Sequence, residues 1–468
     1  MASDQAARTK ANPTAGMLEL HDMDTTITSP RRPAQPTDNE SLPEYRVYKR
    51  RFFGLAQLVL LNIIVSWDWL TFAAVSTTSA QFFDVTEGAI NWLSTAFFFS
   101  FLPMVPLVIW TLNRYGPKAS ILISSSLVLV GNWIRYAGTR ASTPQYGVVV
   151  FGQILIGFSQ PFVLAAPTRY SNVWFSDQGR VSATAIATLA NPLGGALGQL
   201  IGPFWATSPS HIPSMVLYTA ILSTVATLPA PFLPKSPPTP PSAIAAAEKL
   251  HVRQALRELP RNRAFWLIFF PFAVYVGLFN AISSLLNQIL SPYGFSEDDA
   301  GITGALLIVV GLVASAIVSP FVDRKRKHLP VIKAMVPTIA LSYLVFIFMP
   351  GTRSIAGPYI VAAILGASSF SLLPAVLEYL VLVTHPVSPE ITSTICWASG
   401  QLLGAIFVIV MNALKGGWTG EPPETMRSAL IFQAVVALVV VPLPMLLGRG
   451  KFGSESPGEG MVRLRSPT

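Results

Sequence analysis

Residues 52–78 form a long apolar segment, and one acid, Asp68, lies in it between Trp67 and Trp69. The segment can cross a bilayer, which takes roughly 20 apolar residues. An acid at the bilayer centre costs about 2.5–3.5 kcal/mol, so it is kept where it faces a cavity or a partner. Indole rings present a negative face and the acid adds a charge, and together they suit a cation. The segment therefore predicts a membrane transporter with Trp69 and Asp68 near its substrate path.

Polar side chains share helix faces in three further apolar segments. The pairs, four or seven residues apart, are Gln153 and Gln160, Asn280 and Asn287, Trp397 and Gln401. Lone amides in membrane helices are more often interhelical hydrogen bonds than ligand contacts. Four such faces nevertheless favour a common cavity, because these segments line the centre of a transporter built from two halves. We expect the substrate-binding residues to be Trp69, Asp68, Gln160, Asn280, Gln401 and Trp397.

Two acids are candidates for proton coupling. Asp68 is one, and Glu378, beside Tyr379 in the segment 356–383, is the other. For Glu378, an anchoring role near a helix end is equally expected. The choice between proton coupling and simple passage down a gradient therefore stays open.

The composition indicates a protein whose solvent is lipid. Of its 468 residues, 51% are hydrophobic and only 12% are charged, with a mean hydropathy of +0.51. Soluble domains carry about 25% charged residues. The single cysteine, Cys396, excludes a disulfide framework and a cysteine-based metal site. The net charge of +9 forms no continuous basic face, so we expect no nucleic-acid partner. The five His residues do not cluster at ligand spacing, and we expect no metal and no cofactor.

About twelve apolar segments of membrane-spanning length follow one another, which predicts an all-α polytopic membrane protein. They are expected at 52–78, 89–112, 119–138, 146–167, 181–205, 213–233, 264–290, 300–322, 330–350, 356–383, 391–414 and 427–447. The stretch 234–262 divides them into six-helix bundles at 46–233 and 263–447. It predicts a short amphipathic helix on the cytoplasmic surface. Residues 1–45 read as a disordered cytoplasmic tail, and 448–468 as a second cytoplasmic tail.

The basic residues of the short loops set the expected orientation. They gather on one side if the segments alternate: Lys49, Arg50, Arg51, Arg114, Lys118, Arg169, Arg180, Arg324, Lys325, Arg326 and Lys327. Positive loops stay in the cytoplasm, so both termini are expected there. The sequence leaves open whether the membrane is the plasma membrane or that of a vacuole or other organelle.

A loop repeats between the two halves. LNRYGPK at 112–118 supplies Asn113, Arg114 and Gly116, and FVDRKRK at 321–327 supplies Asp323 and Arg324. This resembles the cytoplasmic loop motif of the major facilitator superfamily, which pairs an acid with a basic residue and a glycine. The first copy has Asn in place of the acid, and the second lacks the glycine. Plain positive flanking of a membrane segment is the alternative reading for either loop.

Four stretches resemble the feline leukaemia virus subgroup C receptor family, a facilitator branch linked to choline, ethanolamine and heme. They are INWLSTAFFFSFLPMVPLVIWTLNRYG (90–116), GQILIGFSQPFVLAAPTRYSNVWF (152–175), SSLLNQIL (283–290) and CWASGQLLG (396–404). The resemblance implies a major facilitator fold of about twelve helices in two halves. It runs through nearly all segments and leaves out the tails and the 234–262 loop.

The resemblance also implies site residues. In members that carry choline, it implies an aromatic, a Gln, a Tyr and a Gln at positions that fall on Trp69, Gln160, Asn280 and Gln401. Asn280 departs from the expected aromatic, and Asp68 stands where the family has a neutral Gln. These two changes favour a small cation with hydrogen-bonding hydrogens, such as a primary amine, at least as much as choline.

The function expected is secondary transport of a small organic solute, most simply a cation such as choline or ethanolamine, by alternating access. No GxxxxGK[ST] loop for ATP is present, so energy must come from gradients. Heme is an alternative cargo, although axial ligands are scarce in the segments. A pyridoxine-like solute, suggested by residues 183–198, is another alternative cargo. Transport coupled to protons, and a transporter-shaped receptor or sensor, are the remaining alternatives. We expect a monomer and no enzyme, because no catalytic set of residues appears.

Overall fold

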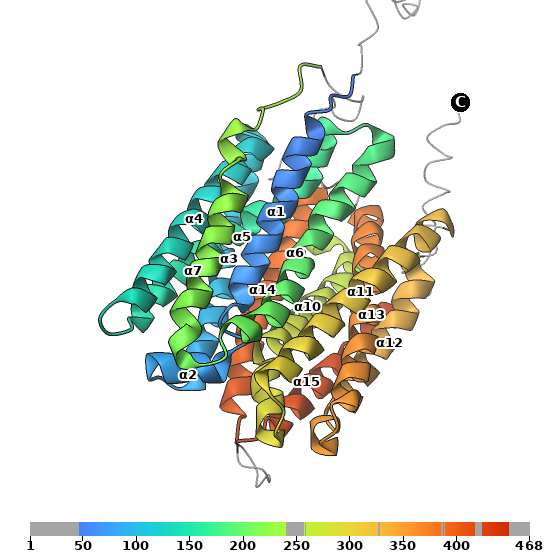
Figure 1. The fold of residues 1–468 in the computed structure, drawn as a ribbon. Coiled ribbons are helices and arrows are strands. Elements are labelled where there is room, and N and C mark those ends of the chain that lie inside the picture. The colour runs from blue at the N-terminus through green and yellow to red at the C-terminus, as the bar shows by residue number, and fades with distance from the viewer. Residues whose placement is uncertain are drawn as a thin grey trace, which may run out of the picture. The chain divides into compact units, whose positions relative to one another are not determined.

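The computed structural model describes residues 46–239, 257, 259–325, 328–384, 387, 389–416 and 424–448. Over this part of the chain the regular elements are helices (Figure 1). The long ones are α1 (Arg51–Leu70), α3 (Glu87–Arg114), α4 (Pro117–Arg140), α5 (Tyr146–Trp174), α6 (Asp177–Trp205), α7 (Ile212–Thr227), α10 (Arg263–Leu290), α11 (Glu297–Lys325), α12 (His328–Phe346), α13 (Ala356–Thr384), α14 (Pro389–Ala413) and α15 (Arg427–Val439). The short ones are α2 (Ser76–Phe83) and α16 (Pro442–Met445), with 3-10 turns at Pro209–His211, Ala230–Phe232, Leu259–Arg261, Ser291–Tyr293 and Pro350–Thr352.

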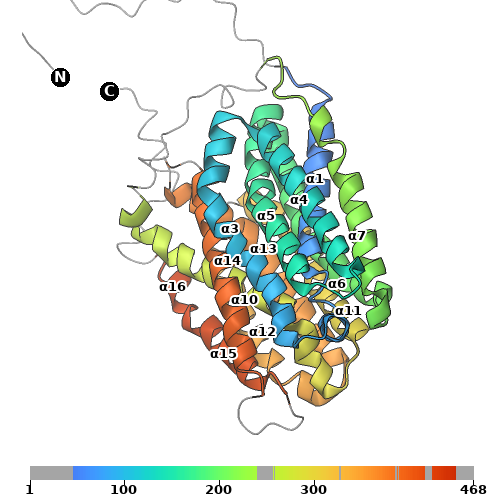
Figure 2. The same cartoon turned by 90° about the vertical axis from the view of Figure 1, so that its left-hand side faces the viewer.

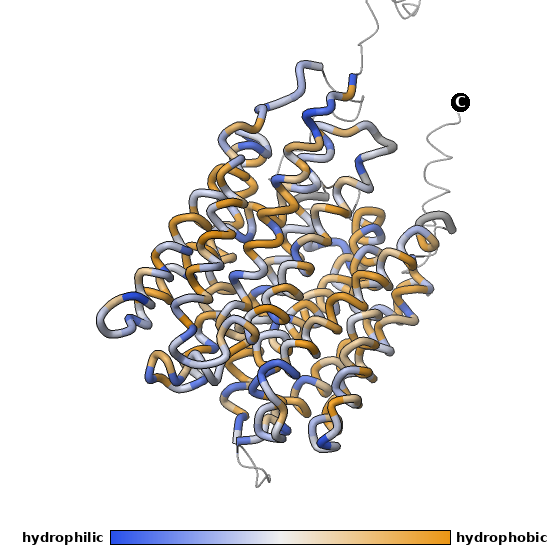
Figure 3. The backbone as a smooth tube through the Cα atoms, in the orientation of Figure 1, coloured by the Kyte–Doolittle hydropathy of each residue, from blue (hydrophilic) through white to orange (hydrophobic). Residues whose placement is uncertain are grey.

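The predicted all-α polytopic fold is confirmed. Among the described residues, 11 helical stretches are long and apolar enough to span a membrane. Helix α6, with 29 residues, has the length but not the hydropathy, because glycines and polar residues interrupt it. Apolar residues run along the helices and hydrophilic ones concentrate at their ends (Figure 3).

Consecutive long helices alternate in direction, so the described bundle has two ends. We call them the Arg51 end, where α1 begins, and the Glu87 end, where α3 begins. Helices α1 and α3–α7 lie together, as do α10–α15 (Figures 1 and 2). The division into two bundles at 234–262 stays a prediction, as the described helices belong to one unit by their contacts.

The first membrane segment differs from its expected bounds. It was expected to continue to residue 78, but α1 ends at Leu70, and turns lead into α2 at Ser76. The main-chain oxygen of Asp68, in the last turn of α1, accepts hydrogen bonds from the side chains of Arg135 and Gln153 at 3.1 and 3.2 Å. Side chains of other helices thus satisfy a carbonyl at the helix end, as buried helix ends require.

Helix α6 lies against α1 through its glycines. A side chain at Gly194 would clash with the main chain of Ile63, and one at Gly198 would crowd that of Trp67. Small residues spaced by four let two helices approach closely in a membrane. This close packing fixes the last turns of α1, which carry Asp68 and Trp69.

Some predictions fall outside the described residues. These are the two tails at 1–45 and 448–468, apart from residue 448, and most of the linker at 234–262 with its amphipathic helix.

Candidate functional site

A cavity lies between helices from both parts of the bundle. One wall comes from α1, α5 and α6, and includes Ser66, Gln160, Thr188 and Asn191. The other wall comes from α10–α14 with Pro444 and Leu447, and it is mostly apolar. None of the described residues that line it carries a charge. A solute in this cavity would therefore meet aromatic rings, amides and hydrocarbon.

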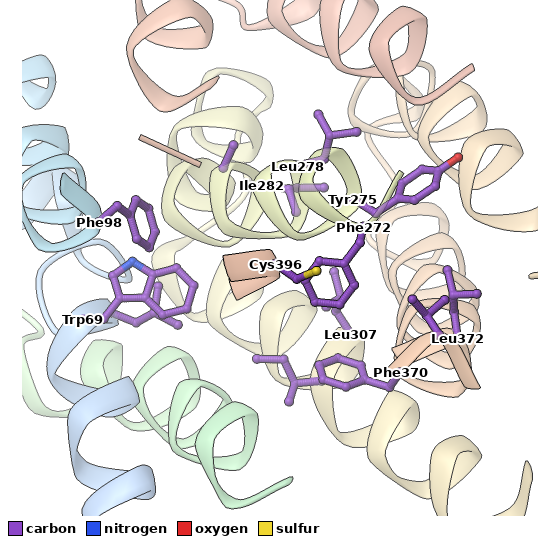
Figure 4. Close-up of a cluster of buried hydrophobic side chains, with 14 of the residues drawn as sticks. Trp69, Phe98, Phe272, Tyr275, Leu278, Ile282, Leu307, Phe370, Leu372 and Cys396 are labelled. Carbon is purple, nitrogen blue, oxygen red and sulfur yellow. The ribbon is translucent and has the colours of Figure 1, made fainter. Parts of the chain in front are cut away.

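Trp69 forms the aromatic part of the α1 wall. Its ring lies 5.2 Å from that of Phe98 in an edge-on contact and 6.4 Å from that of Phe97 in a stacked one. Figure 4 shows Trp69 beside Phe98 and apart from Phe272 and Phe370 of the opposite wall. Two packed rings behind Trp69 hold its indole in place, which a rigid cation–π wall requires.

Two buried polar atoms of the cavity residues lack a hydrogen-bond partner in the described part of the chain. They are the Nε1 atom of Trp69 and the Oε1 atom of Gln160. Buried donors and acceptors are nearly always bonded, so an orphan in a native fold calls for an explanation. A cargo with both hydrogen-bonding capacities would supply the missing partners.

Asn280 and Gln401 form the facing amide pair. The Nδ2 atom of Asn280 donates to Oε1 of Gln401 at 3.1 Å, joining α10 to α14. The contact is close because Gly404 faces the side chain of Asn280, where a larger residue would clash. Trp397, one turn before Gln401, packs edge-on against Phe272 with ring centres 5.5 Å apart.

Five of the predicted substrate-binding residues line this one cavity, and the two predicted proton-binding residues do not. The five are Trp69, Gln160, Asn280, Trp397 and Gln401. Glu378 is exposed on α13. Asp68 is fully buried on another face of α1. The roles of all seven in transport stay predictions.

Asp68 is bound to α4. Its Oδ2 atom accepts a hydrogen bond from Asn132 Nδ2 at 2.6 Å, and its Oδ1 atom lies 3.6 Å from NH1 of Arg135. Arg135 also donates to Gln153 Oε1 at 3.0 Å, and its guanidinium lies over the ring of Phe72. Both charged side chains have no exposed surface. The negative charge of Asp68 is thus paired inside the α1–α4–α5 cluster.

Trp67 also lies away from the cavity. Its ring stacks on Trp205 of α6, with ring centres 5.7 Å apart. Residues 67–69 therefore do not form one wall, because successive side chains of an α-helix point about 100° apart. Of the three, Trp69 is the one that lines the cavity.

At the Glu87 end, polar contacts join helices of the two parts of the bundle. The bonded pairs are Asn91–Gln288 (2.7 and 3.1 Å), Asn91–Asn412 (2.9 Å), Thr78–Glu297 (2.8 and 3.1 Å) and Lys415–Glu87 (2.6 Å). Most cavity residues of α10, from Ile268 to Val276, lie in the half of the helix that begins at the Arg51 end. The bundle is thus fastened on one side of the cavity.

Comparison with known proteins identifies the superfamily of the chain. Residues 58–408 match the sequence model of the Major Facilitator Superfamily. The chain belongs to this superfamily. Among its relatives is solute carrier family 49 member A3 of Danio rerio, which is 33% identical over 80% of this chain and 81% of the relative.

Two further relatives carry names that include a cargo. Choline/ethanolamine transporter flvcr2b of Danio rerio is 27% identical, over 80% of this chain and 79% of its own. Choline/ethanolamine transporter FLVCR1 of Felis catus is 25% identical, over 88% of this chain and 76% of its own. The resemblance to the feline leukaemia virus subgroup C receptor family is thereby confirmed.

Solved facilitator structures share the fold. A bacterial homolog of the human lysosomal transporter Spinster, inward-facing and unoccupied, matches with a TM-score of 0.64 at 15% identity, over 90% of this chain and 100% of that one. A D-xylose-proton symporter matches with a TM-score of 0.61 at 14% identity, over 85% and 96%. At this identity the likeness concerns the fold alone.

The predicted facilitator loop motif is only partly visible. Asn113 and Arg114 end α3, and Gly116 precedes α4 with a φ of 78°, a conformation that favours glycine. The side chains of Asp323 and Arg324 lie outside the described residues. The functional role of the motif stays a prediction.

Sequence reasoning missed Arg135 and the aromatics of the α10–α13 wall. The signal for Arg135 was present, because it lies inside the segment 119–138 and opposite charges in two membrane segments tend to pair. For Phe272, Phe279 and Phe370 no such signal existed. Phenylalanine is common throughout the chain, with 28 copies, and only the packing shows which of them face the cavity.

Proposed function

We propose that this facilitator carries a small organic cation of the choline and ethanolamine kind, and that it favours a quaternary ammonium. The single observation that carries the proposal is the uncharged cavity in which Trp69, Gln160, Asn280 and Gln401 meet. The relatives named as choline/ethanolamine transporters support the same cargo class.

The preference for a quaternary ammonium follows from the placement of Asp68. A primary ammonium is strongly hydrated, and it loses that hydration in a cavity without a carboxylate. A quaternary ammonium has no N–H groups to satisfy, and an indole face attracts it by about 2 kcal/mol when it is desolvated. Because Asp68 is paired with Arg135 and does not line the cavity, a primary amine is less favoured than choline, whereas the sequence favoured it at least as much.

We infer that the two walls exchange access by rocking around the bound cargo. Ligand contacts from both parts of the bundle support this, since each part can then close over the site. The Arg51 end carries Lys49, Arg50, Arg51 and Arg114, so we infer that it faces the cytoplasm, together with both termini. The cavity would then be closed on the far side by the contacts at the Glu87 end.

For the energy source we propose the membrane potential. A cation gains about 2.3 kcal/mol per charge per 100 mV. Proton binding by Asp68 would remove the negative charge that lies 3.6 Å from the Arg135 guanidinium and leave that buried cation uncompensated, which disfavours proton coupling there. We propose a monomer that transports and does not catalyse. Heme is disfavoured because Tyr275, the one described lining residue of a type that ligates heme, donates its hydroxyl to the main-chain oxygen of Ala437 at 3.0 Å.

Uptake of labelled choline into liposomes that contain the purified protein tests the proposal. We expect saturable uptake that rises with a negative interior potential and does not change with a pH gradient. Unlabelled ethanolamine should compete more weakly than choline, and pyridoxine and heme should not compete. Chemical conversion of choline without net uptake, or competition by heme alone, would contradict the proposal.

A further inference from the structure

Helix α6 presents a polar stripe to the cavity that the predicted binding residues do not include. Thr188, Asn191 and Pro192 all line the cavity, and a spacing of three or four residues places them on one face of the helix. Thr188 and Asn191 both keep part of their surface accessible. The exposed apolar residues Ile186 and Leu193 lie on the opposite face, so the accessible surface of the stripe borders the cavity.

The side-chain amide of Asn191 is oriented so that its oxygen stays free. Its Nδ2 atom donates to the main-chain oxygen of Asn62 in α1 at 3.3 Å. A carbonyl oxygen only accepts, so the amide nitrogen must be the atom on that side. Among the residues that the structure describes, none donates a hydrogen bond to the Oδ1 atom of Asn191. Asn191 therefore offers a hydrogen-bond acceptor at the cavity wall.

A second acceptor on this stripe comes from the main chain. In a regular α-helix the N–H group of residue 192 would donate to the carbonyl oxygen of Thr188, but Pro192 has no N–H group. This oxygen points along the helix toward residue 192, and both residues line the cavity. The Thr188 carbonyl thereby keeps its acceptor capacity within one helical turn of Asn191.

We propose that the Oδ1 atom of Asn191 and the main-chain oxygen of Thr188 bind N–H groups of the cargo's ammonium, and so decide how well the carrier accepts ethanolamine beside choline. This rests on the proposed function and specifies the selectivity of the same site. No described lining residue is a carboxylate, so neutral oxygens must replace the water that a primary ammonium loses. Choline has no N–H group and gains no such bond, whereas the indole of Trp69 attracts both cargos.

A series of cargos in which methyl groups replace the N–H groups one by one tests this. The series is ethanolamine, N-methylethanolamine, N,N-dimethylethanolamine and choline, and each competes with labelled choline for uptake into liposomes that contain the protein. Asn191→Leu should lower the affinity for ethanolamine about tenfold, the effect of losing a hydrogen bond to a charged group. The loss should shrink with each methyl group, and the affinity for choline should change less than about twofold.

Gln199→Leu is the matched control for the side chain. It also removes an amide from α6, but Gln199 does not line the cavity, and its Nε2 atom donates to the main-chain oxygen of Ser283 at 2.6 Å. The readout is the ratio of ethanolamine affinity to choline affinity, which a loss of folded protein does not change. This ratio should keep its value in Gln199→Leu.

Pro192→Ala tests the main-chain acceptor. Alanine restores the N–H group of residue 192, which then bonds the Thr188 oxygen within the helix. The ratio of ethanolamine affinity to choline affinity should fall about threefold. Pro203→Ala is the matched control, because Pro203 also lies inside α6 but does not line the cavity. It should leave the ratio unchanged.

The outcomes separate this inference from the proposed function. If choline is taken up and Asn191→Leu weakens ethanolamine and choline equally, Asn191 acts through packing and the inference is overturned. An equal fall of the ratio in a variant and its control overturns it as well. If Asn191→Leu does not fold, Pro192→Ala decides, and an unchanged ratio then counts against the inference. If the unmodified protein takes up neither choline nor ethanolamine, the proposed function itself has failed.

Discussion

Two faces of α1, one residue apart, carry opposite chemistry. Asp68 faces α4 and lies in a sealed cluster with Arg135, Asn132 and Gln153. Trp69 faces the cavity, where no described lining residue is charged. The charges therefore belong to the helix packing, and the cavity is lined by rings, amides and hydrocarbon. A charged residue beside a binding residue in sequence need not belong to the site, because the helix turns it away.

The largest effect on stability is expected when the buried Asp68–Arg135 pair loses one of its two charges. Arg135→Leu leaves Asp68 buried without its cation and should cost about 3–5 kcal/mol of stability. Thermal unfolding of the purified protein in detergent measures the loss. The control is the double variant Asp68→Asn with Arg135→Gln, which keeps hydrogen-bonding amides and removes both charges. It should be far more stable than Arg135→Leu, and equal losses in the two would break the comparison.

A smaller effect, on the KM for choline, is expected when the cavity loses the indole ring of Trp69. Trp69→Leu removes a cation–π contact of about 2 kcal/mol, which corresponds to roughly a thirtyfold rise in KM for choline. Trp67→Leu is the matched control, because it also removes an indole but one stacked on Trp205. Uptake per folded protein in liposomes gives both values. A similar rise in KM for both variants would show that Trp69 acts through packing alone.

The orphan acceptor of Gln160 is expected to contribute less. Gln160→Leu should weaken choline binding by about 1 kcal/mol, roughly fivefold, by removing a hydrogen bond to its hydroxyl. Tetramethylammonium, which has no hydroxyl, is the control cargo and should be affected much less. If both cargos weaken equally, Gln160 shapes the cavity and does not bind the hydroxyl.

The smallest effect is expected at the Lys415–Glu87 ion pair of the Glu87 end, whose side chains are 17% and 21% exposed. Burial alone would lower the pKa of Lys415, but the hydrogen bond and charge of Glu87, with the charge of Glu424, outweigh it and raise that pKa. The stabilising contribution is therefore complete at neutral pH and is lost only as the pH rises through this raised pKa. Partly exposed pairs contribute about 0–1 kcal/mol.

Thermal unfolding against pH tests this for Lys415→Gln. The variant should unfold within a few degrees of the unmodified protein at pH 7, and the difference should vanish at strongly alkaline pH. High salt should reduce it as well, because salt screens exposed charges. A loss as large as that of Arg135→Leu would show that burial does not decide the strength of these pairs.

Much of the candidate site could be predicted because membrane segments restrict the options. An amide such as Gln160 or Gln401 is costly in lipid, so its presence in an apolar segment already indicates a protein-facing position. The cavity does bring these two together with Trp69, Asn280 and Trp397. The orientation of Asp68 could not be predicted, because a buried acid faces either a cavity or a partner, and the segment alone does not say which.

The sequence by itself determined the all-helical membrane fold, since 51% hydrophobic residues in segments of spanning length have no other stable arrangement in lipid. It also determined the superfamily and the polar residues that meet. Only the tertiary structure decided that Arg135 pairs with Asp68, that α1 ends at Leu70, and that apolar residues of α10–α14 form the second wall of the cavity. The physical reason is that hydropathy fixes which residues avoid lipid. Which neighbour each one faces depends on how the helices rotate and pack against each other.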